Sequence, residues 1–229
     1  MIYLLFDLDG TLFDSDHIIL DAFQEGIRKF NKSSHSNISV PSKEKIMSFI
    51  GIPTKNIYQT LFPQLNEDKV QIINDQCTES LSKMIYNGGG RLYDNTYSTL
   101  KNLHKKGYTF FLASNGRIKY IEAALKSTKI MKFFSQPIIH LNEKIIDKTT
   151  IVMKYKKIIP KNSLIIMIGD RESDRTAAFE NNIPFIGCAY GHVGEKEILG
   201  TRWIINEFTE IPIIIKEIEK EFEKKKQLH

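Results

Sequence analysis

The sequence has 229 residues, of which 41% are hydrophobic, and a formal net charge of +5. This length and apolar content suffice for a large core in one domain, or in a domain with an insert. No apolar run approaches the roughly 18 residues that span a bilayer, so no membrane partner is expected. Lysine and arginine are spread along the chain, with a dense run only at 224–226, which does not favour a nucleic-acid partner.

Two features of the sequence bear on location in the cell. The short apolar run at the N-terminus has no basic segment ahead of it, which does not fit a signal peptide. Cys77 and Cys188 fit no metal or redox spacing and are expected to be reduced, buried thiols. Together these features predict a cytoplasmic protein.

The first predicted strand covers 2–6, an apolar run that ends at Asp7 and Asp9. Two carboxylates at the end of a buried strand are unfavourable unless a cation lies between them, and oxygen ligands of this kind suit Mg²⁺. Gly10 allows a sharp turn and a close backbone approach to a ligand. Thr11 can cap the next turn or donate to an anion. This stretch is therefore a candidate site.

The interval 16–87 contains no convincing strand. Apolar side chains recur at helical spacing over 16–31 and again over 67–86. A run of three glycines at 88–90 then provides a flexible return. We therefore expect 16–87 to form a helical insert after the first strand.

Strands and helices alternate in the rest of the chain. Apolar runs of strand length, the last a short edge candidate, lie at 109–113, 136–140, 164–168, 184–188 and 203–205. Helical patterns lie at 94–106, 117–126, 149–158 and 174–182, and an amphipathic pattern ends the chain. The alternation predicts an α/β fold, a doubly wound parallel sheet with helices on both faces. Reactive groups in such sheets lie at the carboxyl ends of the strands.

Two polar sites follow these predicted elements. Ser114 and Asn115 end the second strand with a hydroxyl and free backbone N–H groups, which can bind phosphate oxygens. Lys148 opens a helix, and a cation there would neutralise charge on a nucleophile and on a phosphoryl group. Lys144 and Lys154 compete with it for that role.

Another acidic site follows the strand at 164–168, which runs directly into Gly169 and Asp170. Asp170 and Asp174 lie one helical turn apart if a helix begins there. A second buried strand thus ends in acids, which would meet Asp7 if the two strands are neighbours in the sheet.

The string DLDGTLFDS at 7–15 resembles the first motif of the haloacid dehalogenase-like (HAD) superfamily. The strand end at Ser114 and the GDxxxD pattern at 169–174 are similar to its second and fourth motifs. Lys148 is similar to its third motif, although Thr149 stands where many relatives have proline. The match continues to about residue 190 and is similar to the phosphoglycolate phosphatase-like subgroup.

The resemblance implies a domain organisation. A Rossmann-like α/β core would comprise 1–15 and 88–229, and a helical cap would comprise 16–87. The segment 50–54 resembles the substrate-specificity loop of related caps.

The resemblance also implies a Mg²⁺-dependent phosphatase that hydrolyses a small phosphorylated metabolite, a phosphoglycolate-like phosphomonoester. Asp7 would attack phosphorus and form an aspartyl-phosphate, and Asp9 would act as general acid and then base. Mg²⁺ would be held by Asp7, Asp170 and the backbone carbonyl of Asp9. Asp174 would support the site by orienting Lys148 or reaching the metal through water.

Substrate contacts are expected at Thr11, Ser114, Asn115 and Lys148.

Asp9 argues against a dehalogenase, which needs no second catalytic aspartate. Within the superfamily, an inorganic pyrophosphatase and a phosphosugar mutase similar to β-phosphoglucomutase stay open. A non-catalytic regulator that binds a phosphorylated ligand is the alternative from another class. We expect a monomer or a homodimer.

Overall fold

The computed structural model describes residues 1–50, 54–142, 144–192 and 194–227. Its main sheet has five strands, each parallel to its neighbours. Their order across the sheet is β4 (Thr109–Leu112), β1 (Ile2–Phe6), β5 (Leu164–Gly169), β6 (Phe185–Cys188) and β7 (Trp203–Ile205). The predicted α/β class is confirmed, and β1 and β5 are neighbours, as the acidic sites require.

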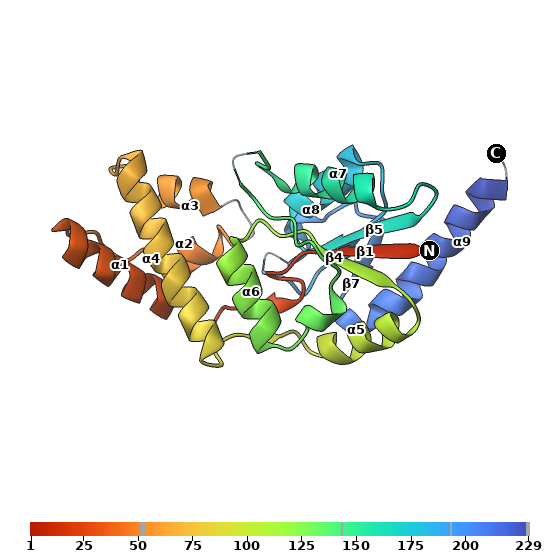
Figure 1. Cartoon of the computed structure of the whole chain (residues 1–229), viewed down its shortest axis with the longest axis horizontal. Coiled ribbons are helices and arrows are strands. Elements are labelled where there is room, and N and C mark those ends of the chain that lie inside the picture. Colours follow the sequence, from red (N-terminus) through yellow and green to blue (C-terminus); the bar gives the residue numbers. More distant parts are fainter. Residues whose placement is uncertain (51–53, 143, 193, 228–229) are drawn as a thin grey trace.

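Helices cover both faces of the sheet, which is why its strands are apolar on both faces. Leu4 and Phe6 of β1 pack on one side with helices α5 (Thr96–Lys105), α6 (Ile118–Ser127) and α9 (Ile211–Gln227). Tyr3 and Leu5 point the other way and pack with α7 (Lys148–Ile158) and α8 (Glu172–Glu180). Figure 1 shows α7 and α8 on one side of the sheet and α5 and α9 on the other. The alternation of side chains along β1 thus separates two apolar cores.

The segment between β1 and α5 forms the predicted helical insert. Its helices are α1 (Ile19–Ser34), α2 (Lys43–Met47), α3 (Thr54–Leu61) and α4 (Glu67–Tyr86). They enclose an apolar core of their own, which includes Phe23, Phe30, Phe62, Ile73 and Cys77. In Figure 1 the insert lies at one end of the molecule, and α4 lies against α6 of the core.

A short antiparallel ladder joins the insert to the core. Strand β2 (Phe13–Asp14) precedes the insert and pairs with β3 (Arg91–Leu92), which follows it. Asp14 lies opposite Arg91, and the guanidinium Nε of Arg91 is 3.0 Å from Asp14 Oδ2. The insert therefore leaves and re-enters the core at one place. The division into 1–15 with 88–229 and 16–87 stays a prediction.

One predicted strand is wrong. Residues 136–140 form no strand, and the sheet edge beside β4 carries only an isolated bridge between Phe110 and Phe134. Pro137 lacks the N–H that a ladder needs, so the apolar run cannot continue as a paired strand there. The chain also forms short 3₁₀ helices at Met131–Phe133, Gly194–Glu197 and Phe208–Glu210. In the described ranges, no helix is both long and apolar enough to cross a membrane.

Candidate active site

The predicted acidic residues meet at the carboxyl edge of the sheet. Asp7 directly follows β1, and its N–H donates to the carbonyl of Ile168 in β5, at 2.9 Å. Asp170 directly follows β5, and Asp174 lies in the first turn of α8. Asp7, Asp170 and Asp174 are buried, and each places a carboxylate oxygen within 4.8 Å of the others. Parallel pairing of β1 with β5 is what brings these acids together.

A buried ammonium group lies among these carboxylates. Lys148 Nζ is 2.9 Å from Asp7 Oδ1 and 2.5 Å from Asp174 Oδ1. Burial alone would lower the pKa of Lys148, but the carboxylates of Asp174 and Asp7 outweigh burial and raise it. The side chain of Asp147 caps α7 by accepting from the N–H of Thr150, at 2.7 Å, and this places Lys148 at the first helical position.

The competing lysines lie elsewhere. Lys144 is exposed and Lys154 is half-buried, whereas Lys148 is almost entirely buried. No ion pair between Lys144 or Lys154 and these carboxylates occurs in the part of the chain that the structure describes. Of the three candidates, the structure brings Lys148 to the acidic cluster.

The residues around Asp170 fit tightly. Its Oδ2 accepts from the backbone N–H of His192, at 3.0 Å, and its Oδ1 lies 3.5 Å from the hydroxyl of Thr11. A Cβ added to Gly10, whose φ is +76°, would lie 2.1 Å from Asp170 Oδ2. A Cβ at Gly191 would lie 2.3 Å from Asp170 Cβ. Glycine is required at both positions because the carboxylate occupies the space of a side chain.

Burial and mutual repulsion destabilise the charge on this cluster. Burial raises the pKa of Asp170 and of Asp174, and the neighbouring Asp7 raises both further. The buried Oδ2 of Asp7 has no hydrogen-bond partner in the described structure. One ammonium group cannot neutralise three carboxylates, so a divalent cation would balance the remaining negative charge of the cluster. The oxygen donor set fits Mg²⁺.

Asp9 faces away from this cluster. It is buried, and its Oδ1 accepts a short hydrogen bond from the hydroxyl of Tyr120 on α6. Burial raises the pKa of Asp9 to about 7, with a contribution from Asp7, although the Tyr120 bond opposes the rise. A carboxyl group that titrates near neutral pH can donate a proton in one step and accept one in the next.

The predicted substrate contacts divide into two groups. Ser114 and Asn115 are buried beyond the end of β4, and both line a pocket together with Asp9. The hydroxyl of Ser114 accepts from the N–H of Gly116, at 3.0 Å. Thr11 is also buried, but its hydroxyl faces Asp170 and its carbonyl accepts from Tyr190. Thr11 thus lies behind the acidic cluster, and its role in substrate binding stays a prediction.

Sequence reasoning missed several side chains at the site. Tyr120 lies in a predicted helix, and no local pattern in the sequence signals its contact with Asp9. Arg171 directly follows Asp170, and its Nε is 3.0 Å from Glu197 Oε2. Its Nη2 reaches the carbonyl of Ser48 in the insert, at 3.5 Å, and its Nη1 is buried without a hydrogen-bond partner in the described structure. The sequence signal for Arg171 was its positive charge inside the fourth motif, next to Asp170.

His192 lies in the loop after β6, on the active-site side of the sheet. Its ring is nearly fully buried, with Nδ1 3.0 Å from Asp16 Oδ1. Burial lowers the pKa of His192, although Asp16 opposes this effect. Its backbone, rather than its ring, contacts the acidic cluster.

The sheet, its acidic edge and the helical insert after the first strand define a capped α/β hydrolase. The chain belongs to the haloacid dehalogenase-like hydrolase family, whose family model matches residues 4–188. It is therefore an enzyme, and the fold and the family expected from its motifs are confirmed.

Curated relatives and solved structures are similar over most of the chain. Pyrophosphatase PpaX of Anoxybacillus flavithermus is 23% identical over 206 residues, which cover 85% of this chain and 86% of that protein. A predicted phosphatase from Clostridium acetobutylicum is 26% identical, with a TM-score of 0.77 and coverage of 94% of this chain and 98% of that one. A predicted phosphoglycolate phosphatase from Haemophilus somnus is 22% identical, also with a TM-score of 0.77, and covers 93% and 97%.

Proposed function

We propose that the protein is a Mg²⁺-dependent phosphatase that hydrolyses a small phosphomonoester through an aspartyl-phosphate at Asp7. The observation that carries the proposal is the buried, unpartnered Oδ2 of Asp7 beside the ammonium group of Lys148. An unpaired carboxylate oxygen in such a place is unfavourable for stability alone, and it is suited to attack an electrophile or to bind a cation.

The first half of the reaction transfers the phosphoryl group to Asp7. A carboxylate oxygen of Asp7 forms a bond to phosphorus, and the bond from phosphorus to the ester oxygen breaks. The electron pair goes to that oxygen, which takes a proton from the carboxyl group of Asp9. Ser114, Asn115 and Lys148 bind the phosphoryl oxygens and stabilise the charge that develops on them.

The second half returns Asp7 to its starting state. Asp9, now a carboxylate, takes a proton from water, and the resulting hydroxide oxygen attacks phosphorus. The bond between phosphorus and Asp7 breaks, and inorganic phosphate leaves. Asp174 holds Lys148 in place through the 2.5 Å contact. Mg²⁺, held by Asp7, Asp170 and the backbone carbonyl of Asp9, would supply further positive charge to the phosphoryl group.

Release of phosphate from p-nitrophenyl phosphate, with Mg²⁺ and with excess chelator, tests this proposal. We expect release that depends on the metal, and Asp7→Asn should abolish it while leaving the circular dichroism spectrum unchanged. Near-normal release by the folded Asp7→Asn protein would contradict the assignment of the nucleophile. A non-catalytic regulator would release no phosphate, and a phosphosugar mutase would need a sugar phosphate for multiple turnovers.

An inorganic pyrophosphatase is the second candidate function. Relatives named pyrophosphatase PpaX favour it, and so does the unpartnered Nη1 of Arg171, since a guanidinium group suits a second phosphate. Arg171 lines a polar pocket together with Lys148 and Asn115. Pyrophosphate cleavage faster than hydrolysis of every phosphomonoester tested would favour this alternative. The cytoplasmic location and the monomeric or homodimeric state stay predictions.

A further inference from the structure

The pocket that Asp9, Ser114 and Asn115 line lies between the core and the insert. Its volume is about 70 Å³, whereas a cavity needs only about 10–15 Å³ to hold one water molecule. The pocket begins at the proposed general acid and the proposed phosphoryl contacts, so the part of a substrate that extends from the phosphoryl group past Asp9 would enter it.

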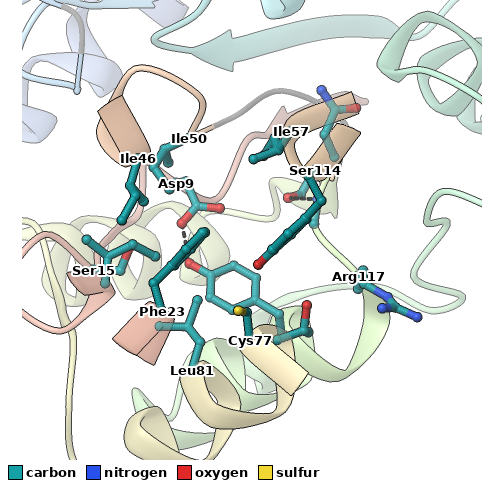
Figure 2. A pocket seen from close by; sticks show the side chains of 16 residues that line it. Asp9, Ser15, Phe23, Ile46, Ile50, Ile57, Cys77, Leu81, Ser114 and Arg117 are labelled. Atoms are coloured by element: carbon teal, nitrogen blue, oxygen red, sulfur yellow. Dashed lines mark hydrogen bonds between the residues drawn. The ribbon is translucent and has the colours of Figure 1, made fainter. Parts of the chain in front are cut away.

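The insert lines this pocket with apolar side chains. They come from α1, α2, α3 and α4, and include Ile19, Phe23, Ile46, Ile57, Tyr58 and Leu81. Phe23 and Tyr58 stack with their ring centroids 5.5 Å apart and their planes within 4° of parallel. Figure 2 shows Phe23, Ile46, Ile57 and Leu81 around the same space as Asp9 and Ser114.

The pocket offers little to bind a charged group. Among the lining side chains that the structure describes, Asp9 and Arg117 carry charge, and Arg117 is already paired with Asp75. Tyr58 and Cys77 both lie in an apolar environment that favours their neutral forms, since burial raises the pKa of each. A carboxylate or a second phosphate in this space would be buried without a free cationic partner among these side chains, which is strongly unfavourable.

We propose that this pocket receives the leaving group of the substrate, and that this group is apolar: an alcohol that carries an aromatic or branched aliphatic group about the size of a phenyl ring. The proposal rests on the proposed phosphatase function. It favours a carbon-containing leaving group over the phosphate of pyrophosphate and over the carboxylate of phosphoglycolate. An apolar group fills the space without leaving a buried charge unpaired.

Four phosphate compounds test this assignment. Benzyl phosphate and methyl phosphate have leaving alcohols of similar acidity, so their comparison isolates contacts with the pocket. We expect kcat/KM for benzyl phosphate to exceed that for methyl phosphate by at least about 10-fold, because hydrophobic pockets discriminate by about 10- to 200-fold per missing methylene. It should also exceed the values for 2-phosphoglycolate and pyrophosphate. A preference for either charged compound would overturn the inference and leave the phosphatase proposal intact. No phosphate release from any compound, p-nitrophenyl phosphate included, would contradict the proposed function itself.

A matched pair of variants on α4 locates the effect. Leu81→Gln puts an amide into the pocket, and we expect the benzyl-to-methyl ratio of kcat/KM to fall about 10-fold. Ile72→Gln makes a similar change at a side chain that is 43% exposed and outside the pocket, and it should leave the ratio unchanged.

A second variant tests the same pocket if the first variant does not fold. If Leu81→Gln loses its helical circular dichroism, Leu81→Ala keeps the pocket apolar and enlarges it, and should shift preference toward naphthylmethyl phosphate. An unchanged ratio in folded Leu81→Gln, or unchanged preference in Leu81→Ala, would overturn the proposal.

Discussion

Asp7 and Asp9 lie two residues apart, yet their carboxylates have different partners. Asp7 contacts the ammonium group of Lys148, whereas Asp9 accepts from the hydroxyl of Tyr120. The ring of Tyr120 is fixed by an edge-on contact with Phe13, at a centroid distance of 6.4 Å. Burial raises the pKa of Asp9 to about 7, so this acid can hold a proton near neutral pH while Asp7 lies beside the ammonium group of Lys148.

The hydroxyl of Tyr120 positions the carboxyl group of Asp9. We expect Tyr120→Phe to lower kcat on p-nitrophenyl phosphate about 10-fold, since a hydrogen bond to a charged group contributes about 1.5–3 kcal/mol. KM should change little because the hydroxyl acts on Asp9 rather than on the phosphoryl group. Tyr155→Phe is the control, since in the described structure it removes a tyrosine hydroxyl whose hydrogen bonds go to the backbone of Pro137 and Ile139. Equal losses in both variants would mean that Tyr120 supports folding alone.

Lys148 carries the positive charge of the site. Lys148→Met keeps most of the side-chain volume and removes the charge, so we expect kcat to fall about 10² to 10³-fold. Lys144→Met and Lys154→Met should change kcat less than about twofold, because neither lysine reaches the carboxylates. Thermal unfolding of each variant separates a loss of charge from a loss of fold. An inactive Lys144 or Lys154 variant beside an active Lys148 variant would reverse the motif assignment.

At the scale of elements, the return from the insert depends on backbone that favours glycine. Gly88 and Gly90 have φ values of +91° and +76°. A Cβ at Gly90 would lie 2.1 Å from the ring of Phe13, whereas one at Gly88 would meet nothing within 4 Å. The N–H of Gly89 donates to the carbonyl of Met84, at 2.9 Å, and so satisfies a carbonyl in the last turn of α4. The triglycine is therefore a connection with a specific backbone shape.

Gly88 and Gly90 allow the destabilisation caused by a positive φ to be measured separately from that caused by a steric clash with Phe13. Gly88→Ala should destabilise the protein by about 1 kcal/mol through its positive φ alone. Gly90→Ala should destabilise it by about 2–4 kcal/mol, since it combines the same strain with displacement of Phe13. Urea unfolding followed by circular dichroism measures both values. Equal destabilisation would show that the ring of Phe13 moves aside freely.

The sequence was most informative where a candidate site residue directly follows a strand in the chain. Asp7, Ser114 and Asp170 each follow an apolar run directly, so finding the run located the residue. Sequence reasoning failed at 136–140, where an apolar run was not weighed against the proline inside it. The short helices α2 and α3 were not separately predicted. The predicted substrate-specificity loop at 50–54 consists largely of residues 51–53, which lie outside the described structure.

Contacts between distant segments were beyond sequence reasoning. The bond from Tyr120 to Asp9 joins α6 to the first turn of the chain, and Arg171 reaches from β5 to Ser48 in the insert. Local patterns of hydrophobicity predict which side of a helix is buried, but not which side chain it will meet. Tertiary packing alone determined these partners.

For the molecule as a whole, the buried acids would make stability depend on a bound cation. Mg²⁺ at the proposed site would relieve repulsion among Asp7, Asp170 and Asp174, so it would bind the folded state in preference to the unfolded one. We expect millimolar Mg²⁺ to raise the melting temperature by several degrees relative to excess chelator, and Asp170→Asn to reduce that shift. Differential scanning fluorimetry measures both. Ca²⁺ should bind but inhibit phosphate release, because it prefers more ligands and looser geometry.

No shift of the melting temperature with Mg²⁺, together with full activity after exhaustive chelation, would contradict a metal site here. An Asp75→Asn variant serves as the control, since it removes an acid that lies outside the cluster.

The ladder between β2 and β3 makes the insert an exchangeable part. Asp14 and Arg91 lie opposite each other on one rung of this ladder, so the insert begins and ends at adjacent points, like a hairpin loop whose ends are already closed. Lengthening such a loop has a small entropic cost that grows only with the logarithm of its length. Helices can therefore be added, lost or replaced between Asp14 and Arg91 while the aspartates of the acidic cluster and Lys148 keep their positions. The architecture lets the reaction stay constant while the choice of substrate evolves.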